Sequence, residues 1–294
     1  MLPPGTVLRR DEPLARRTTL RVGGPADIYL EPPTETALAT VLEMCRLRSL
    51  PFLILGRGSN LLVRDGGIRG VVLSLQAPFF TTVESLPENR LRAGAGAPLK
   101  SIAQAARQAG LSGMEFLEGI PGNLGGALRM NAGAMGHWIF DIVHTVRCMD
   151  QRGQIRELSG AEADAQYRGC PLFKTRLALG AVLRGIPAER ATIDERMTAS
   201  NTKRWSSQPR QPSAGCTFKN PFPDQPAGKL IDELNLKGTR VGDAMVSDVH
   251  ANFFVNVGHA TASDVLNLIE LVKARVRQAR GIELETEVEI VGEN

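Results

Sequence analysis

The sequence contains few cysteines, and they form no paired motif. Its four cysteines, Cys45, Cys148, Cys170 and Cys216, are widely separated and include no Cys-x-x-Cys pair. Zinc sites, redox dithiols and disulfide frameworks all depend on recurrent cysteine spacings. The sequence therefore predicts no metal site and no disulfide framework.

Long apolar runs and a dense basic face are also missing. No uninterrupted apolar stretch approaches the roughly 20 residues that cross a bilayer, and residues 1–20 lack the apolar core of a signal peptide. The 35 Lys and Arg against 31 Asp and Glu give a net charge of +4. This excess is too small and too dispersed for a nucleic-acid interface. We therefore expect a cytoplasmic protein that binds neither a membrane nor a nucleic acid.

What the chain does have is the composition of a globular protein, with 43% hydrophobic and 22% charged residues over 294 positions. This length is enough for two or three domains. A first α/β unit is expected from strands at Ala26–Glu31, Phe52–Leu55, Leu61–Val63 and Val71–Leu75, with a helix that Thr34 caps.

A second unit begins near Thr81. It is expected to contain two strands joined by 87–89, a helix around Leu99–Ala106 that Gly110 ends, a hairpin of 143–149 with 155–158, and a strand at 177–186. A glycine-dense stretch, 119–136, interrupts the regular pattern. The polar segment 187–211 is helix-prone and connects to the last part of the chain.

The last part is expected to form an α+β domain. Helices are predicted at 227–235 and 262–280, and strands at 252–257 and 282–291. The final segment alternates strictly, with apolar residues on one face and four glutamates on the other.

The first candidate site is the glycine loop Gly56-Arg57-Gly58-Ser59-Asn60, which follows a strand and precedes another strand. A Rossmann dinucleotide fingerprint needs its glycines to open a helix, so that interpretation is disfavoured. Glycines still let successive amides approach a pyrophosphate closely. A plain tight turn explains this loop equally well.

The second candidate is the run from Gly119 to Ala127, followed by Asn131-Ala132-Gly133. Glycine costs about 1 kcal/mol relative to alanine inside a helix, so this density requires a reason. Close passage of a large ligand is the interpretation that we favour over loop packing. Two such loops in two α/β units suggest one long ligand, such as a dinucleotide.

The third candidate is Ser213–Pro221, which combines Cys216, Lys219 and Asn220 in a segment framed by glycine and proline. Taken alone, Cys216 would most often be a small buried apolar residue. Its polar neighbours make it a candidate for chemistry.

Together these motifs resemble the UDP-N-acetylenolpyruvoylglucosamine reductase (MurB) family, from about Thr18 to the end of the chain. The resemblance rests on several motifs in the family's order: Leu55–Val63, Gly119–Gly122 through Met130–Gly133, Tyr167-Arg168, Gly215–Pro221, Leu236–Gly238 and Leu284–Val288. The short run from Asn220 to Leu236 resembles the shorter of the family's two classes, type II.

The resemblance implies an α+β protein with an FAD-binding fold of the vanillyl-alcohol-oxidase type. Its two α/β subdomains are expected at 1–78 and 79–190, and a substrate-binding domain at 191–294. It implies noncovalent FAD, NADPH as co-substrate, and reduction of UDP-N-acetylglucosamine enolpyruvate to UDP-N-acetylmuramate, a peptidoglycan precursor. We also expect a monomer.

Three catalytic residues follow from the resemblance. Arg168 and Glu287 correspond to paired polar residues beside the enolpyruvyl group, and a guanidinium suits its carboxylate because it forms a bidentate fork. Cys216 stands where many relatives have a serine proton donor, and a thiol with an ordinary pKa of about 8.5 is mostly protonated at neutral pH. Without the resemblance, Arg168 could equally be a surface ion pair, and alternation alone cannot single out Glu287.

The remaining site residues also follow from the motifs. FAD-binding positions are Gly56, Arg57, Gly58, Ser59, Asn60, Leu61, Gly119, Ile120, Pro121, Gly122, Gly125, Gly126, Ala127, Asn131 and Gly133. Substrate-binding positions are Tyr167, Arg204, Lys219, Asn220, Lys237 and His250. One departure is Glu118, where relatives usually carry a small residue.

Two other functions remain open. An FAD-linked alcohol or sugar oxidase has the same fold, but many of those enzymes attach FAD through a histidine where this chain has Ser59 and Asn60. A catalytically dead nucleotide-binding regulator is disfavoured because Arg168, Cys216 and Glu287 are present together.

Overall fold

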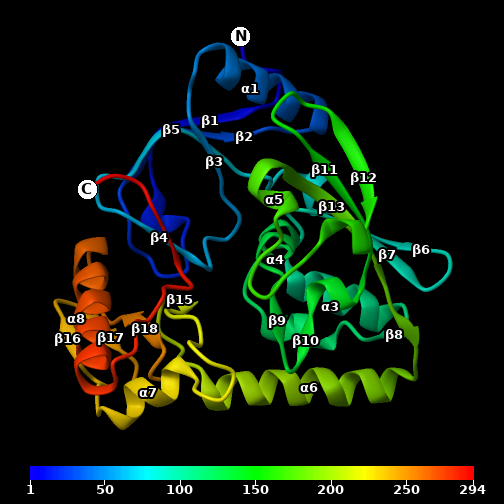
Figure 1. Cartoon of the computed structure of the whole chain (residues 1–294). Helices are drawn as coiled ribbons and strands as arrows, with labels where there is room; N and C mark the ends of the chain where they lie inside the picture. The colour runs from blue at the N-terminus through cyan, green and yellow to red at the C-terminus, as the bar shows by residue number, and fades with distance from the viewer. The chain divides into compact units, whose positions relative to one another are not determined.

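The computed structural model describes all residues, Met1–Asn294 (Figure 1). The chain forms two compact units. Unit 1 comprises Met1–Arg9, Ile28–Gly56 and Gly70–Arg204, and unit 2 comprises Arg10–Asp27, Arg57–Arg69 and Trp205–Asn294. None of the helices combines the length and the apolar character needed to cross a membrane.

Unit 1 contains a five-stranded antiparallel sheet with the order β12-β11-β13-β7-β6. The strands are β6 (Val83–Leu86), β7 (Arg90–Gly94), β11 (Val143–Met149), β12 (Ile155–Ser159) and β13 (Leu177–Arg184). The predicted hairpin is confirmed, because Met149 pairs with Ile155. Helices α3 (Leu99–Gln108) and α4 (Leu124–Met130) share one buried core with this sheet.

Helix α1 (Glu35–Leu47) begins as predicted, because the Thr34 hydroxyl accepts a hydrogen bond from the Ala37 amide at 3.2 Å. Its buried apolar residues belong to the same core cluster as Leu177 and Leu179 of β13. A further sheet has the order β1-β2-β5-β3, formed by β1 (Val7–Pro13), β2 (Pro25–Glu31), β3 (Phe52–Ile54) and β5 (Ile68–Leu73). Strands β3 and β5 are parallel.

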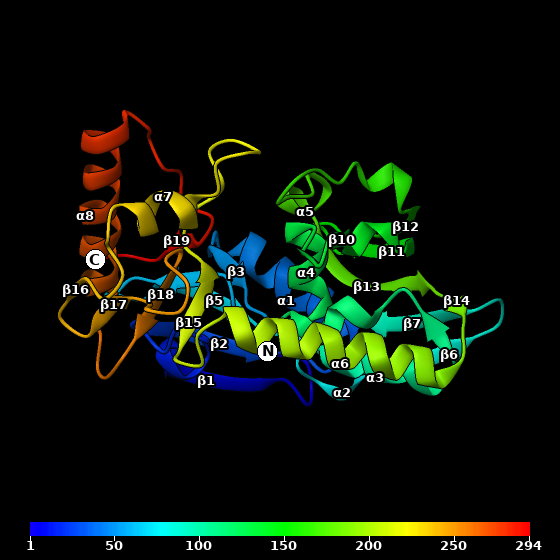
Figure 2. The same cartoon turned by 90° about the horizontal axis from the view of Figure 1, so that it is seen from below.

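The predicted polar connection is the long helix α6 (Arg190–Ser207), which runs along α3 (Figure 2). Arg107 of α3 forms a two-bond ion pair with Asp194 of α6. Arg196 donates to the Ser112 hydroxyl at 2.7 Å. These contacts fix α6 on unit 1, although few of its side chains are buried.

Short elements complete unit 1. They are α2 (Pro78–Thr81), β8 (Leu111–Ser112), β9 (Gly133–Ala134), β10 (His137–Trp138), α5 (Leu172–Thr175) and β14 (Ile186–Pro187).

Unit 2 contains a four-stranded antiparallel sheet with the order β15-β18-β17-β16. Its strands are β15 (Ser213–Cys216), β16 (Arg240–Val241), β17 (Ala244–Val246) and β18 (Phe253–Asn256), and its helices are α7 (Ala227–Glu233) and α8 (Ala262–Arg280). The apolar residues Val265, Leu268, Ile269, Val272 and Val276 of α8 are buried on one side of the helix. The core also includes Leu20, Val22 and Leu62, which come from two earlier segments of the chain.

Helix α8 has the predicted bounds because both ends are fixed by local chemistry. Thr261 and Asp264 form a reciprocal capping box, and Gly281 ends the helix with φ of 68°. Asp65 accepts hydrogen bonds from the amides of Ala262 and Ser263 at 2.8 and 2.9 Å, which satisfies two more amides of the first turn.

Two predictions are wrong. The glycine-dense stretch contains a helix, α4, because Leu124, Ala127 and Leu128 bury one side of it in the core. The alternating segment 282–291 is a strand only at β19 (Glu289–Val291), which pairs in parallel with β4 (Leu61–Val63). Before β19 the backbone is irregular and pairs locally with residues near Thr217.

Candidate active site

Three segments that are far apart in the sequence meet in unit 2. The Glu287 amide donates to the Thr217 carbonyl at 2.8 Å, so the Glu287 segment lies beside the residue that follows Cys216. The Asn60 side chain donates to the Glu287 carbonyl at 3.2 Å, and the Glu289 amide donates to the Asn60 carbonyl at 3.0 Å. The structure thus brings the predicted residues Asn60, Cys216 and Glu287 into one part of unit 2.

Asn252 determines the path of the backbone after Cys216. Its side chain, 3% exposed, accepts from the Phe218 amide at 2.9 Å and donates to the Phe218 carbonyl at 2.8 Å. The pairing of β15 with β18 shifts register between Ser213 and Cys216. The buried amide side chain of Asn252 thus holds the backbone at Phe218, just beyond the end of β15, a role that the strand pattern of the sequence did not reveal.

Cys216 differs from the other cysteines in accessibility. Cys45, Cys148 and Cys170 are buried, whereas Cys216 is half-buried. Burial raises the pKa of the three buried thiols above its ordinary value. Cys216 is therefore the thiol that a solute can reach.

Three predicted substrate residues, Asn220, Lys237 and His250, contact α7, and a fourth precedes the helix in the sequence. The Asn220 side chain accepts from the Ala227 amide at 3.1 Å, and Lys237 pairs with Asp232 at 2.8 Å. The His250 ring lies against α7 at Gly228, where an added Cβ would be 3.2 Å from its Cε1 atom. Lys219, the fourth, pairs with Glu285 at 3.1 Å.

His250 predicts how the stability of the protein changes with pH. Burial, and then the positive charge of Lys237, lower the pKa of His250 below its ordinary value of about 6.5. At a pH between the lowered pKa of His250 in the folded protein and its ordinary pKa in the unfolded chain, the unfolded chain binds more protons than the folded protein. The free energy of unfolding should therefore fall as the pH drops through the window just below 6.5. Denaturant unfolding at about pH 7.5 and 5.5 should show a smaller loss in His250→Gln than in the native protein. Equal losses would contradict this prediction.

In unit 1, Arg168 lies in a tight turn that the Asn131 side chain supports. Gln166 and Gly169 pair with each other through their backbones, and Arg168 has φ of 56°. Asn131 donates to the Gln166 carbonyl at 3.0 Å and accepts from the Phe140 amide at 3.4 Å. Asn131 was predicted to bind a cofactor; its side chain here holds the turn that carries Arg168.

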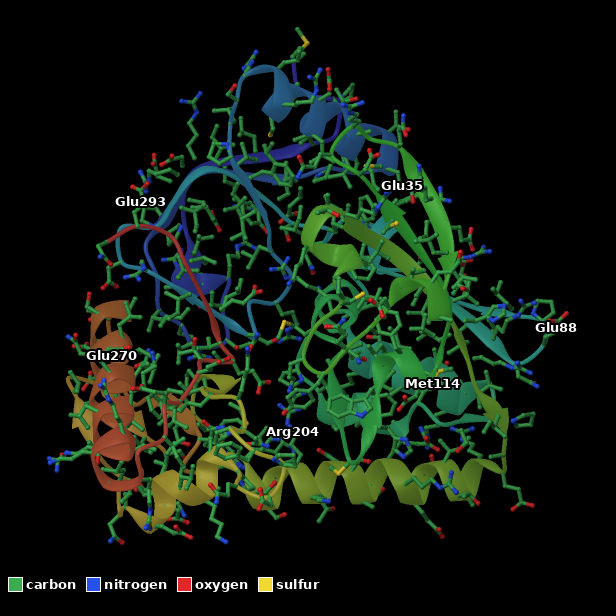
Figure 3. The ribbon with its side chains drawn as sticks, viewed as in Figure 1. Glu35, Glu88, Met114, Arg204, Glu270 and Glu293 are labelled. Atoms are coloured by element: carbon green, nitrogen blue, oxygen red, sulfur yellow. The ribbon has the colours of Figure 1, made fainter.

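Tyr167 and Arg204 are the other predicted substrate residues of unit 1. Tyr167 precedes Arg168 in the turn and is 56% exposed. Arg204 lies near the end of α6 and is half-buried (Figure 3).

The predicted cofactor glycines fall into two groups. A Cβ added at Gly56, Gly119 or Gly126 would meet no protein atom within 4 Å, although Gly119 is buried. A Cβ added at Gly58 would lie 2.8 Å from the carbonyl oxygen of Arg17, and one added at Gly125 would lie 3.1 Å from the Cβ of Ala95. The first group leaves room beside the backbone, whereas the second serves the packing of the chain itself.

Asn123, which sequence reasoning missed, has an unusual environment. It precedes α4 but makes no capping hydrogen bond. Its side chain is 4% exposed, and neither its nitrogen nor its oxygen has a hydrogen-bond partner. A buried amide without partners is costly. The only hint in the sequence is a polar side chain inside the run from Gly119 to Gly126.

Two models of known protein families match the chain. The model of the "FAD binding domain" family matches residues 26–159, and that of "UDP-N-acetylenolpyruvoylglucosamine reductase, C-terminal domain" matches 208–291. The first match contains both glycine stretches, and the second contains Cys216 and Glu287. Arg168 and Arg204 lie between the two matches.

Relatives cover nearly the whole chain. A UDP-N-acetylenolpyruvoylglucosamine reductase of Syntrophus aciditrophicus is 45% identical, covering 97% of this chain and 92% of the relative. The UDP-N-acetylenolpyruvoylglucosamine reductase of Bacillus velezensis is 42% identical, and the match covers 99% of this chain and 95% of that relative. The crystal structure of the MurB reductase of Thermus caldophilus matches with a TM-score of 0.82 at 38% identity, covering 97% and 98% of the two chains.

The chain is thus an oxidoreductase with an FAD-binding fold of the vanillyl-alcohol-oxidase type, which confirms the predicted fold class. It belongs to the UDP-N-acetylenolpyruvoylglucosamine reductase (MurB) family.

The residues of unit 1 fit FAD on two observations. The empty room beside Gly119 and Gly126 admits a ligand close to the backbone. The buried amide of Asn123 offers one acceptor and two donors, which complement the mixed polar edges of a flavin or an adenine.

Asn123 allows FAD binding to be tested separately from folding. In Asn123→Leu, an apolar side chain of similar size replaces buried polar atoms that lack partners, so the apoprotein should be as stable as the native one or more stable. Its FAD dissociation constant, measured by quenching of flavin fluorescence, should rise about tenfold. Asn131→Leu is the matched control and should destabilise the apoprotein, because both polar atoms of Asn131 have partners. Unchanged FAD affinity in Asn123→Leu would refute the assignment.

Proposed function

We propose that this chain catalyses the NADPH-dependent reduction of UDP-N-acetylglucosamine enolpyruvate to UDP-N-acetylmuramate, a step in the synthesis of peptidoglycan precursors. The observation that carries the proposal is the convergence of the Asn60, Cys216 and Glu287 segments in a chain of this reductase family.

The reaction adds a hydride to one carbon of the enolpyruvyl double bond and a proton to the other. Bound FAD supplies the redox chemistry, with NADPH as the source of the two electrons. The chain supplies the proton, and we assign it to the thiol of Cys216. Its partial exposure supports this role, because the thiolate left behind must recover a proton from solvent.

Arg168 and Glu287 are assigned to the charge that develops on the substrate carboxylate. The guanidinium of Arg168 would hold this carboxylate by two parallel hydrogen bonds. Glu287 is assigned to the same carboxylate of the substrate.

The sugar nucleotide is assigned to Tyr167, Arg204, Lys219, Asn220, Lys237 and His250. In unit 2, the last four lie around α7 or just before it, which supports one shared site for them. The lysines are half-exposed and supply positive charge suited to a diphosphate.

Several finer assignments belong to the same proposal. FAD is held noncovalently by the two predicted glycine stretches, and the enzyme is a cytoplasmic monomer of the shorter, type II class. The only helix between Asn220 and Leu236 is α7, which supports the shorter class. FAD subdomains are assigned to 1–78 and 79–190 and a substrate domain to 191–294. Separate family matches at 26–159 and 208–291 support the division between a cofactor part and a substrate part.

Oxidation of NADPH, followed with and without the enolpyruvyl sugar nucleotide, tests the proposal. We expect a flavin absorption band in the purified protein, release of that flavin by heat or acid, and NADPH turnover that depends on the sugar nucleotide. Turnover that is indifferent to the sugar nucleotide would overturn the assigned substrate. Yellow colour that stays with the precipitated protein would overturn noncovalent binding.

A further inference from the structure

We propose that Trp138 is a positioning residue for Arg168, and that Trp138 and Tyr167 together form an aromatic clamp on its guanidinium group. This inference rests on the role proposed for Arg168 above.

The clamp is defined by three contacts within unit 1. The central carbon of the Arg168 guanidinium lies 5.4 Å from the centre of the Trp138 ring and 5.5 Å from that of Tyr167. The two rings meet edge to face, with centres 5.7 Å apart and planes at 78°. Both distances from the cation are within the range of attractive cation–π contacts.

The two halves of the clamp differ in rigidity. Trp138 belongs to β10, pairs with Gly133 of β9, and has its amide bound to the Asp141 carboxylate at 2.7 Å. A Cβ added at Gly133 would collide with the Trp138 ring, so this glycine provides the space that the indole occupies. Tyr167 is exposed and lies in the same turn as Arg168. Trp138 is therefore the fixed surface against which Arg168 is placed.

A contact through aromatic faces suits an arginine that must bind a carboxylate. It attracts the positive charge of the guanidinium but uses none of its N–H groups. The backbone of Arg168 has a φ of 56°, and its long side chain can adopt many rotamers. Contact with Trp138 restricts these rotamers, so the guanidinium is oriented for the carboxylate before the substrate binds.

Rapid-mixing absorbance of the FAD-loaded enzyme tests the inference by separating the two half-reactions. In Trp138→Leu, reduction of the flavin by NADPH should proceed at the native rate, whereas reoxidation by the enolpyruvyl sugar nucleotide should slow about fivefold to thirtyfold. Trp138→Phe keeps an aromatic face and should retain most of the native rate. In an Arg168→Ala background, Trp138→Leu should cause no further loss, because the group that it positions is gone.

The outcomes distinguish this inference from the proposed function. Native reoxidation in Arg168→Ala would remove the role of Arg168 itself. A slow Arg168→Ala with a normal Trp138→Leu, or full additivity of the two changes, would overturn the positioning role alone. Equal slowing in Trp138→Leu and Trp138→Phe would also overturn it, because an aromatic face would then not matter.

Fluorescence tests the clamp without changing Trp138. The chain has two tryptophans, so Trp205→Phe leaves Trp138 as the only indole. In that protein, Arg168→Ala should change the emission of Trp138 because a cation leaves its ring. Arg210, which lies 5.3 Å from the Trp205 ring, gives the matched control, and Arg210→Ala should leave the emission unchanged. Identical emission with and without Arg168 would overturn the clamp.

Discussion

Replacing Cys216 by alanine should preserve the reduction of bound FAD by NADPH and slow its reoxidation by the enolpyruvyl sugar nucleotide about a hundredfold to ten-thousandfold. Reduction by NADPH requires no proton from this thiol, whereas reduction of the substrate double bond does. Rapid-mixing absorbance at the flavin band follows the two stages separately. Native reoxidation in Cys216→Ala would mean that the proton comes from another group.

Two controls sharpen this result. Cys216→Ser should retain much more activity than Cys216→Ala, because the hydroxyl is also a proton donor. Alkylation should inactivate the native enzyme and spare the serine variant, since the other three cysteines are buried and poorly accessible to a reagent. Equal inactivation of both proteins would point to a different reactive residue.

The exchange of Arg168 for lysine should cost about 2 kcal/mol in the second half-reaction, or more than tenfold in rate. The charge is kept, but a compact ammonium cannot reproduce the planar two-bond contact with a carboxylate. Reduction of the flavin by NADPH should be unaffected. Arg156→Lys, at an exposed position of β12 in the same unit, is the matched control and should be neutral. Near-native turnover in Arg168→Lys would leave this residue a structural role only.

Local signals predicted those elements whose ends and faces are encoded within a few residues. Thr34 and Thr261 cap α1 and α8, and Gly281 stops α8, so these helices begin or end where their sequence indicates. The apolar periods of α1, α3 and α8 also correspond to buried faces. Such signals are independent of the rest of the fold, which explains their success.

Predictions failed where distant contacts override a local pattern. Alternation around Glu285 predicted a continuous strand, yet only 289–291 pairs as one, because the preceding residues follow the Thr217 segment. Glycines in α4 hid a helix whose apolar side is buried in the core. Asn123, Asn252 and Trp138 matter through neighbours that the sequence places far away or does not specify.

The meeting of the Asn60 and Glu287 segments, 227 residues apart, has a consequence for the order of events during synthesis. Strand β4 can pair with β19 only after β19 has been synthesised, long after β4 itself. Unit 1 ends at Arg204 and can begin to fold much earlier. Because unit 2 also takes Leu20 and Leu62 into its core, residues 205–294 alone lack part of that core. The part of unit 2 that carries the proposed proton donor is therefore completed only after β19 has been made, later than the glycine stretches.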